Sequence, residues 1–325
     1  MTHLDGAPDV SVIVSAFNRG DEFRDTLESL VHQAAGAVRF EVIAVDNNST
    51  DHTADVIQSF TGRGAVPVRY VFEPEQGVSY GRNAGIRVAH GRVLAFTDDD
   101  IVVAPDWVRA IADRFRQNPE VDYLSGRMLP MFGGAPPAWM GPGNTAPCVL
   151  RDRGGEPIYS KPGHYFPGWA TANIAFRREV FDRVGLFSGA FPRGQDLELI
   201  VRVWRANGRG MYAPDVIVSH RIPADRLTKA YHRMWHSREG EIRARVRFRE
   251  IFDRDGRIIT GEPAITRVLG IPKFLFRELF VEATRWVVAA IRGKEAQAFA
   301  HESQVRQVCS YMRTSFRRRR TTPRT

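Results

Sequence analysis

Arg92-Val-Leu-Ala-Phe-Thr-Asp98-Asp99-Asp100 is an apolar run that ends in three consecutive carboxylates. An apolar run of this length is typical of a buried strand in a parallel sheet, and ligands of open α/β sheets bind where such strands end. Three adjacent acids repel one another unless a cation lies among them. Oxygen ligands at a strand end favour Mg²⁺ or Mn²⁺, and these ions commonly keep a substrate phosphate as a further ligand. We therefore predict a site for a metal ion and a diphosphate here; the alternative is a solvated acidic turn.

Upstream of this run, strand and helix patterns alternate. Strands are predicted over residues 11–15, 40–45 and 66–72, and apolar residues at helical spacing follow each of them. This alternation is typical of βαβ units in a doubly wound sheet, in which the loops at the carboxyl ends of the strands line one crevice. Asn18, Asp46 and Arg82 are therefore expected to lie near the three aspartates, although they are distant from them in sequence.

The composition of the whole chain is that of a globular protein. It has 325 residues, of which 43% are hydrophobic and 10% aromatic, so it can bury a substantial core. Cys148 and Cys309 are far apart and lack metal-ligand spacing, which argues against a zinc site and a disulfide framework. The N-terminal residues lack the basic and apolar regions of a signal peptide, so a cytoplasmic protein is expected.

Four segments of the chain resemble, in order, the successive motifs of the family 2 glycosyltransferases with the GT-A fold. They are SVIVSAFNR at 11–19, VDNNSTD at 45–51, GVSYGRNAGI at 77–86 and FTDDD at 96–100. The resemblance extends through residues 11–220 and implies an α/β GT-A domain with a mostly parallel central sheet. We expect a catalytic domain at 1–222, with a nucleotide-sugar half at about 9–105 and an acceptor half at about 106–222. A basic helical extension is expected at 223–325.

The resemblance also implies roles for single residues in the nucleotide-sugar half. Asp46 corresponds to the acid that recognises the nucleotide base, and Arg82 to a residue near the nucleotide, where a guanidinium suits a phosphate or a base carbonyl. Without the resemblance, Asp46 could simply begin a turn and Arg82 could be a solvated helix charge. Ala16, Asn18 and Arg19 complete the first motif and are included in the expected nucleotide-sugar site.

The acidic run corresponds to the DxD motif of the family. Asp98 and Asp100 match its two ends, which bind the ribose and the divalent metal on the diphosphate. Asp99 fills the variable middle position, so it is expected to matter less, although it is kept in the nucleotide-sugar set. His220 follows the apolar run 216–219 and matches a histidine that completes the metal shell in many family members. A lone histidine after a strand is also commonly structural.

Asp196 is the expected catalytic base. Leu197, Ile200, Val203 and Trp204 form one apolar helical face, so Asp196 lies at the start of a helix with its side chain free to point into the crevice. The alternative is a helix N-cap, for which Asp is favoured without any chemistry. The preceding residue departs from the family, because Gln195 replaces the usual Glu and cannot ionise.

The acceptor site is expected in the second half of the domain. Trp169 and Asn173 lie in a segment that resembles the part of the family sequence that carries the donor sugar and approaches the acceptor, and Gln195 is included with them. Residues 130–168 are so rich in Gly and Pro that loops over the site are predicted. Four aromatic residues in or next to this region either stack on sugars or pin the loops to the core. They are Trp139, Tyr159, Tyr165 and Trp169.

The basic character of the chain belongs to its C-terminal third. Residues 1–220 contain 22 basic and 26 acidic side chains, a net charge of −4, whereas residues 221–325 contain 24 and 11, a net charge of +13. Apolar residues within 275–291 form a helical stripe interrupted by charges, which favours an amphipathic helix over a spanning one. Together with the arginines at 317–320, this helix could hold the protein on the anionic inner face of the plasma membrane. The alternatives are a helix packed on the catalytic domain and a disordered charge run.

The sequence thus predicts an inverting glycosyltransferase that uses Mn²⁺ or Mg²⁺. It would move a sugar from a nucleotide diphosphate sugar, with UDP favoured, to a hydroxyl of a glycan or lipid-linked acceptor, and Asp196 would take the proton. Two other classes stay open: a nucleic-acid-binding protein acting through its basic tail, and a catalytically silent GT-A scaffold. The acidic balance of the crevice-bearing domain weighs against nucleic acid. The sugar, the acceptor and the oligomeric state are not readable from the sequence.

Overall fold

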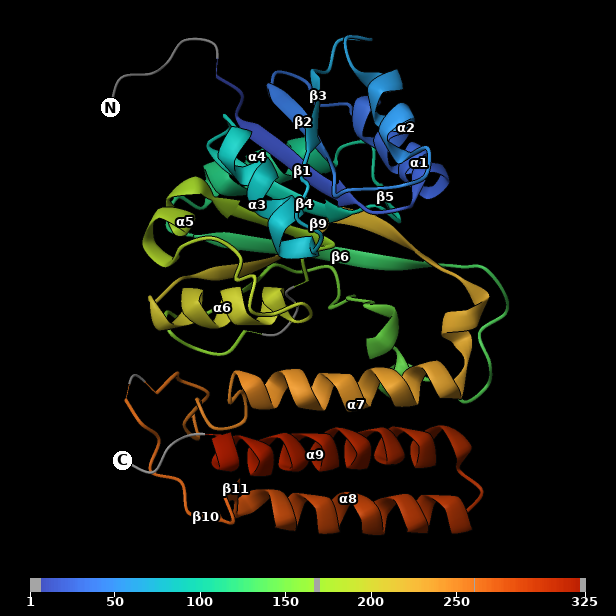
Figure 1. The fold of residues 1–325 in the computed structure, drawn as a ribbon, viewed down its shortest axis with the longest axis vertical. Helices are drawn as coiled ribbons and strands as arrows, with labels where there is room; N and C mark the ends of the chain where they lie inside the picture. Colours follow the sequence, from blue (N-terminus) through green and yellow to red (C-terminus); the bar gives the residue numbers. More distant parts are fainter. Residues whose placement is uncertain (1–6, 167–169, 260, 322–325) are drawn as a thin grey trace. The chain divides into compact units, whose positions relative to one another are not determined.

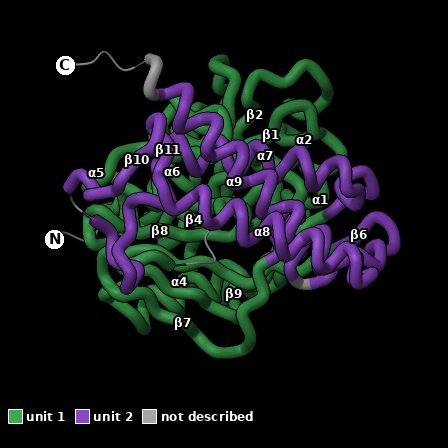
Figure 2. The backbone as a smooth tube through the Cα atoms, turned by 90° about the horizontal axis from the view of Figure 1, so that it is seen from below, with its two compact units in different colours: residues 1–130, 151–221 green, residues 131–150, 222–325 purple. Residues whose placement is uncertain are grey.

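The computed structural model (Figure 1) describes residues 7–166, 170–259 and 261–321. The chain divides into two compact units, which Figure 2 distinguishes by colour. Unit 1 contains residues 1–130 and 151–221, and unit 2 contains residues 131–150 and 222–325. Residues 131–150, which were expected in the acceptor half of the catalytic domain, thus cluster with the C-terminal helices.

Unit 1 is built on one mixed sheet with the strand order β3-β2-β1-β4-β8-β6-β9-β5, and the short β7 pairs with β9. The strands are β1 (Val10–Ala16), β2 (Phe40–Asp46), β3 (Val68–Phe72), β4 (Val93–Asp98), β5 (Ile101–Val103), β6 (Tyr123–Phe132), β7 (Ile158–Tyr159), β8 (Asn173–Arg177) and β9 (Gly210–Ile222). β1 pairs in parallel with β2 and β4, and β2 with β3. β8 runs antiparallel to β4 and β6. The predicted α/β class with parallel strands in its central sheet is confirmed.

Helices cover this sheet between the strands. They are α1 (Gly20–Val31), α2 (Thr53–Phe60), α3 (Val78–Val88), α4 (Trp107–Gln117), α5 (Arg178–Val184) and α6 (Gln195–Arg205). Two glycines one turn apart allow α3 to lie directly on β1: a Cβ at Gly81 would lie 2.2 Å from Ser15 Oγ, and one at Gly85 would lie 2.5 Å from Ile13 Cγ2. This close packing fixes the first turns of α3 at the carboxyl end of β1.

The apolar run that precedes the aspartates forms the buried strand that was predicted. Within β4, the side chains of Leu94, Ala95 and Phe96 are fully buried. Phe96 packs edge-on against Phe176 of β8, with ring centroids 6.1 Å apart. The strand is thus buried along its length, and Asp98 at its carboxyl end is half-buried.

The sequence analysis missed β6 and β8. The sequence of β6, YLSGRMLPMF, contains a glycine and a proline, so it shows neither clean alternation nor a continuous apolar run. A Cβ at Gly126 would lie 2.0 Å from the Val216 carbonyl oxygen, which shows that this glycine is required by the close approach of β9. That requirement depends on a strand 90 residues away and is invisible locally.

Unit 2 is a layer of three long helices: α7 (Lys229–Arg245), α8 (Phe274–Ile291) and α9 (Glu295–Thr321). α9 lies between the other two (Figure 1). The unit also contains the 3₁₀ turns η1 (Pro142–Asn144), η2 (Ala146–Cys148) and η3 (Ala224–Leu227) and the small hairpin β10 (Arg267–Val268) and β11 (Ile271–Pro272). Its core includes Ala244, Leu275, Val308 and Tyr311. Within the described ranges, no helix is both long and apolar enough to cross a bilayer.

α7 buries a polar face against α9. His232, His236, Gly240 and Ala244 recur every four residues and are the buried residues of α7. At Gly240, a Cβ would lie 2.2 Å from the Gln307 carbonyl oxygen, so the helices meet there backbone to backbone. The ring nitrogens of His236 have no hydrogen-bond partner among the described residues. Burial, with the nearby charges of His232 and Arg243, lowers the pKa of His236 to about 4.

We expect unit 2 to lose stability as the pH falls. Because the pKa of His236 is about 4 in the folded state and 6.5 is ordinary for histidine, the unfolded state binds a proton first. The contribution of neutral, buried His236 to the free energy of unfolding is therefore complete above about pH 6.5. It is lost as the pH falls to about 4, a decrease of about 3 kcal/mol. Urea unfolding measured across this range should show a smaller decrease for His236→Phe than for the wild type. The control His32→Gln, at an exposed position, should lose as much stability as the wild type. If His236→Phe also lost as much stability between pH 6.5 and pH 4 as the wild type, His236 would not be the cause of the loss.

Candidate functional site

The loops that follow β1 and β2 are tied together at the carboxyl edge of the sheet. Ala16 pairs in register with Asp46, so the ends of the two strands are adjacent. Asn18 has a positive φ of 52°, its Oδ1 accepts a hydrogen bond of 2.7 Å from the Thr50 amide, and its own amide donates to Ser49 Oγ. The structure therefore brings together Ala16, Asn18, Arg19 and Asp46, which the sequence analysis had assigned to one site.

Asp46 ends β2 and is 2% exposed. Its Oδ1 accepts a 2.9 Å hydrogen bond from the Ser49 amide, and the Tyr70 hydroxyl donates to Oδ2 at 3.3 Å. Burial, and then the charge and hydrogen bond of Asp46, raise the pKa of Tyr70. Asp46 thus does begin a turn, as the alternative interpretation held, and its second oxygen faces a hydroxyl on β3.

Two exposed aromatic residues at this edge were missed by the sequence analysis. Phe17 follows Ala16 directly, and Phe72 pairs in register with Asp46 at the end of β3; both are exposed. An apolar ring left in solvent beside a buried carboxylate is suited to stacking on a planar ligand. Both could have been found from the sequence, because each stands at the end of a predicted strand.

Arg82 lies on α3 and forms an ion pair with Asp98, in which Nη2 donates to Oδ1 at 2.8 Å. The Arg82 side chain is almost fully buried, and its guanidinium carbon lies 5.5 Å from the centre of the Phe187 ring. These contacts rule out a solvated helix charge. The second terminal nitrogen, Nη1, is buried and has no hydrogen-bond partner among the described residues.

The three carboxylates of the acidic run have different surroundings. Asp98 and Asp99 are half-buried, whereas Asp100 is buried. Burial, and then the charge of Asp100, raise the pKa of Asp99 to about 7, although Arg19 opposes the shift. The Asp99 carbonyl accepts a hydrogen bond from Thr26 on α1, which anchors the run to the first helix. The run is therefore a crowded anionic turn rather than a freely solvated one.

Asp100 and His220, the two residues that the sequence analysis assigned to a metal, lie side by side. The pairing of β5 with β9 places Ile101 opposite His220, and the Arg221 amide donates to the Asp100 carbonyl at 3.1 Å. His220 Nε2 is 3.5 Å from Asp100 Oδ2, and both side chains are largely buried. Over the described part of the chain, no group of three or more His, Cys, Asp or Glu side chains is arranged to hold a metal ion.

Asp196 lies in the first turn of α6 but is not its N-cap. Gly194 occupies the cap with a positive φ of 74°, and no side chain caps the helix. Asp196 is half-buried, and its Oδ1 accepts a 2.8 Å hydrogen bond from the Leu197 amide. The neighbouring Gln195 is buried, and its Oε1 has no hydrogen-bond partner among the described residues. The N-cap interpretation of Asp196 is therefore wrong.

The segment that leads into α6 is fastened to α3. The Asn83 amide group donates to the Phe187 carbonyl at 2.8 Å and accepts from the Phe187 amide at 3.0 Å. Ser79 Oγ donates to the Ser188 carbonyl at 3.0 Å. Since Arg82 lies on the same helix, these bonds hold residues 187–188 against the helix that carries Arg82. The sequence analysis missed Asn83, although it stands inside the third motif.

Asn173 is not available for an acceptor, contrary to the prediction. It is 1% exposed, its Oδ1 accepts from Trp107 Nε1 at 2.9 Å, and its Nδ2 donates to the carbonyls of Arg127 and Val216. The side chain therefore joins β8 to α4, β6 and β9, and we remove it from the acceptor set. Trp169 lies outside the described residues.

The other aromatic residues of the loop region differ in their surroundings. Trp139 is buried in unit 2 and packs against His232 and Phe299, with ring centroids 4.9 and 4.7 Å apart, so it pins its loop. Tyr159 and Tyr165 are exposed in unit 1. Only the latter two keep a surface on which a sugar could stack.

Comparison with known proteins identifies the family. Residues 11–185 match the family model described as Glycosyl transferase family 2. A glucosyl-dolichyl phosphate glucuronosyltransferase of Haloferax volcanii is 27% identical over 224 residues, which are 66% of this chain and 69% of that protein.

Two solved structures are similar in fold. A mannosyltransferase from Pyrobaculum calidifontis in complex with GDP-Man and Mn²⁺ has a TM-score of 0.61 at 19% identity, over 94% of this chain and 86% of that one. Residues 1–349 of S. aureus TarS in complex with UDP have a TM-score of 0.51 at 16% identity, over 98% and 93%. The chain belongs to glycosyl transferase family 2 and has the GT-A fold.

Proposed function

We propose that this protein is an inverting, metal-dependent glycosyltransferase. It would move a sugar from a nucleotide diphosphate sugar, with UDP as the favoured nucleotide, to a hydroxyl of a glycan or lipid-linked acceptor. The observation that carries the proposal is that the acidic run directly after β4 is paired at both of its ends: Asp98 with Arg82 of α3, and Asp100 with His220 of β9. Cationic, anionic and imidazole groups at this edge suit a ligand that carries both phosphate and a divalent metal.

The donor nucleotide would lie across the ends of β1, β2 and β3. The Asp46 carboxylate can accept a hydrogen bond from an N–H of the base, while the exposed ring of Phe17 can stack on it. Nη1 of Arg82, which is buried and has no partner among the residues described, supplies a donor for a phosphate or a base carbonyl oxygen. An unpaired buried guanidinium nitrogen is costly in the free protein, so a ligand oxygen there would contribute favourably to binding.

Asp100 and His220 fit a divalent cation. They offer a carboxylate oxygen and an imidazole nitrogen 3.5 Å apart, both largely shielded from bulk water, which suits Mn²⁺ or Mg²⁺. When bound, such an ion would neutralise charge that develops on the diphosphate leaving group. The related mannosyltransferase in complex with GDP-Man and Mn²⁺ supports this assignment.

Asp196 is the proposed general base. It lies in the N-terminal turn of α6, and an ionised carboxylate is the form that accepts a proton from the attacking hydroxyl. Oε1 of Gln195 is buried and has no hydrogen-bond partner in the described part of the chain, so it can accept a hydrogen bond from a second hydroxyl of the acceptor or donor sugar. A base on the side opposite the leaving group produces in-line displacement and hence inversion at the anomeric carbon.

The acceptor and the location of the protein are also proposals. The dolichyl phosphate in the name of the Haloferax relative supports a lipid-linked acceptor here, and with it peripheral attachment at the inner face of the plasma membrane.

A nucleic-acid function for the basic region is weakened by its internal ion pairs. Glu302 accepts from both Arg233 and Arg306, and Glu278 pairs with Arg249, so several arginines are already neutralised.

The donor site is tested by Asp46→Ala. Loss of a charge-assisted hydrogen bond of about 1.5–3 kcal/mol should weaken nucleotide affinity about 10- to 100-fold. Turnover at saturating donor should change little, because this contact is made equally in the ground and transition states. Isothermal titration with UDP and GDP in the presence of Mn²⁺ measures the effect. Tyr70→Phe removes the hydroxyl that binds Asp46 but keeps the carboxylate, so it should retain affinity; equal losses in both variants would indicate a structural role only.

A further inference from the structure

α8 carries an apolar stripe that is exposed in the part of the chain that the structure describes. Phe276, Phe280, Val287 and Ile291 recur at intervals of four, seven and four residues, which places them on one side of an α-helix. Phe280 is 73% exposed and Ile291 is 81% exposed, whereas Leu275 on the opposite side is fully buried against α9. The helix is therefore amphipathic, with an apolar face in solvent in addition to its packed face.

Basic residues accompany this stripe. Lys273 and Arg277 lie at the start of α8 near the stripe, whereas Arg285 and Arg292 lie farther along the chain on the side that faces α9; all four are exposed. An exposed apolar stripe with basic residues beside it is typical of a helix that lies in the plane of an anionic membrane surface. The charge of this face does not suit a second copy of the same face, because like charges would then be opposed.

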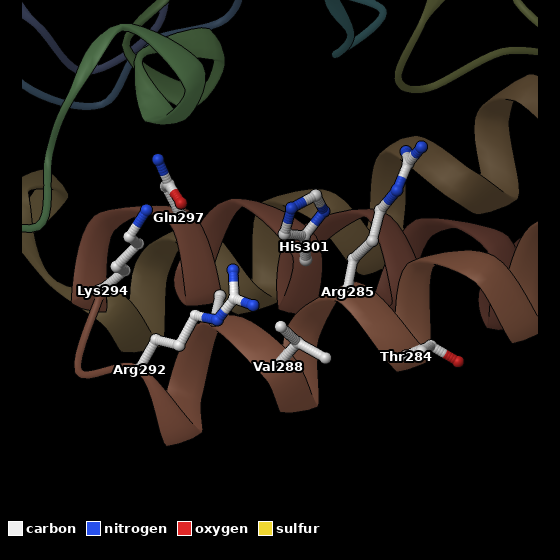
Figure 3. Close-up of a pocket in the computed structure, with 8 residues that line it drawn as sticks. Thr284, Arg285, Val288, Arg292, Lys294, Gln297 and His301 are labelled. Carbon is white, nitrogen blue, oxygen red and sulfur yellow. The ribbon is translucent and has the colours of Figure 1, made fainter.

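A pocket of about 590 Å³ opens between α8 and α9 next to the end of the stripe. Its lining includes the polar and basic residues Arg285, Arg292, Lys294, Gln297 and His301. Figure 3 shows these side chains along the two adjacent helices. Thr284, Val288 and Ala289 of α8 complete the lining. The pocket thus joins a cationic lining to an apolar surface.

The charges around this pocket are not all neutralised. Glu282 accepts from Arg285 at 3.0 Å and from His301 at 2.7 Å, so these two groups already have an acidic partner. Glu295, at the start of α9, is paired with Lys229. Neither Arg292 nor Lys294 forms an ion pair with a described residue. Two cations two residues apart therefore face the pocket without a neutralising carboxylate.

We propose that the pocket between α8 and α9 binds the phosphate of an anionic membrane lipid, while the apolar stripe of α8 enters the acyl region of the same leaflet. This proposal deepens the peripheral attachment proposed above and rests on it, but it does not depend on the sugar or acceptor. Arg292 and Lys294 hold the phosphate, and Phe280 and Ile291 are the deepest apolar contacts. The size of the pocket accommodates a headgroup phosphate with its glycerol carbons.

The test is sedimentation of the full-length protein with vesicles of phosphatidylcholine alone or mixed with phosphatidylglycerol. We expect binding to the mixed vesicles, and a decrease of about thirtyfold for the double variant Arg292→Gln, Lys294→Gln. Each basic residue contributes about 1 kcal/mol at an anionic surface, and 1.4 kcal/mol corresponds to a tenfold change. The matched control Arg39→Gln, Arg63→Gln removes the same charge from exposed positions of unit 1 and should lose far less.

A second variant pair separates insertion from charge. Phe280→Ser with Ile291→Ser should weaken binding to the mixed vesicles, and the remaining binding should be abolished by high salt.

Inorganic phosphate at the concentration of lipid phosphate should not displace the wild-type protein from vesicles. Displacement would assign the pocket to free phosphate and overturn the lipid assignment. Equal binding by the control and the pocket variant, or a concentration-dependent dimer without vesicle binding, would also overturn it. Donor binding by the pocket variant should stay intact, so a failure here is distinct from a failure of the proposed reaction.

Discussion

Asp196→Asn is expected to reduce the turnover of sugar transfer by about 10²–10⁴-fold, the usual contribution of a positioned general base. The substitution preserves the shape of the side chain and its oxygen near the Leu197 amide, so α6 should start as before. It removes the group that we propose takes the proton from the acceptor hydroxyl. Because Asp196 is not part of the proposed nucleotide site, the affinity for the nucleotide should be unchanged.

The measurement for Asp196 is release of nucleoside diphosphate under saturating donor, with the acceptor that supports the fastest wild-type release. The control is Asp182→Asn, which removes an exposed carboxylate from the neighbouring helix α5 and should keep full activity. The pH dependence adds a second readout: activity that requires an ionised carboxylate should decline on the acidic side in the wild type. Turnover of Asp196→Asn within a few-fold of the wild type would reject Asp196 as the base.

Asp100→Ala is expected to lower metal-dependent turnover by about 10²–10³-fold, in the range found for removing one preorganised electrostatic contact. The variant leaves His220 without its acidic neighbour at 3.5 Å. It should also raise the concentration of Mn²⁺ needed for half-maximal activity, because one of two protein ligands is lost. His220→Ala should shift the metal requirement in the same direction.

The metal prediction needs a control for charge and for folding. Asp55→Ala removes an exposed carboxylate of α2 and should change neither turnover nor the metal requirement. Circular dichroism should show the same fold for all variants. If Asp100→Ala lost activity but kept the wild-type requirement for Mn²⁺, Asp100 would be a structural residue and the proposed metal site would be incorrect.

The parallel half of unit 1 was predictable because its signals are local. Buried parallel strands have continuous apolar sequences, and their carboxyl ends share one edge, so the positions of Asp46 and of the acidic run followed from strand ends alone. The ion pair of Arg82 with Asp98 agrees with that convergence. The exposed Phe17 lay within reach of the same argument and was overlooked.

The second half of unit 1 and the helices of unit 2 depend on contacts between distant residues. Asn173 was expected at the acceptor, but its three hydrogen bonds reach groups 43 to 66 residues away, and no local pattern reports them. Trp139 stands in a loop region whose composition suggested a lid, yet its partners are on α7 and α9. A polar or aromatic residue is assigned to function or to packing by its neighbours, which the sequence does not show.

The central claim is that a nucleotide diphosphate and a divalent metal bind at the carboxyl edge of the sheet. It is tested most directly by thermal unfolding of the protein with UDP, GDP, dTDP or CMP, each with and without Mn²⁺. Our account predicts that one diphosphate raises the unfolding temperature only when Mn²⁺ is present, with a stabilisation of about 2.7 kcal/mol at 100 times its dissociation constant. The shift should disappear in Asp100→Ala. No shift with any nucleotide would contradict the account and favour a catalytically silent scaffold.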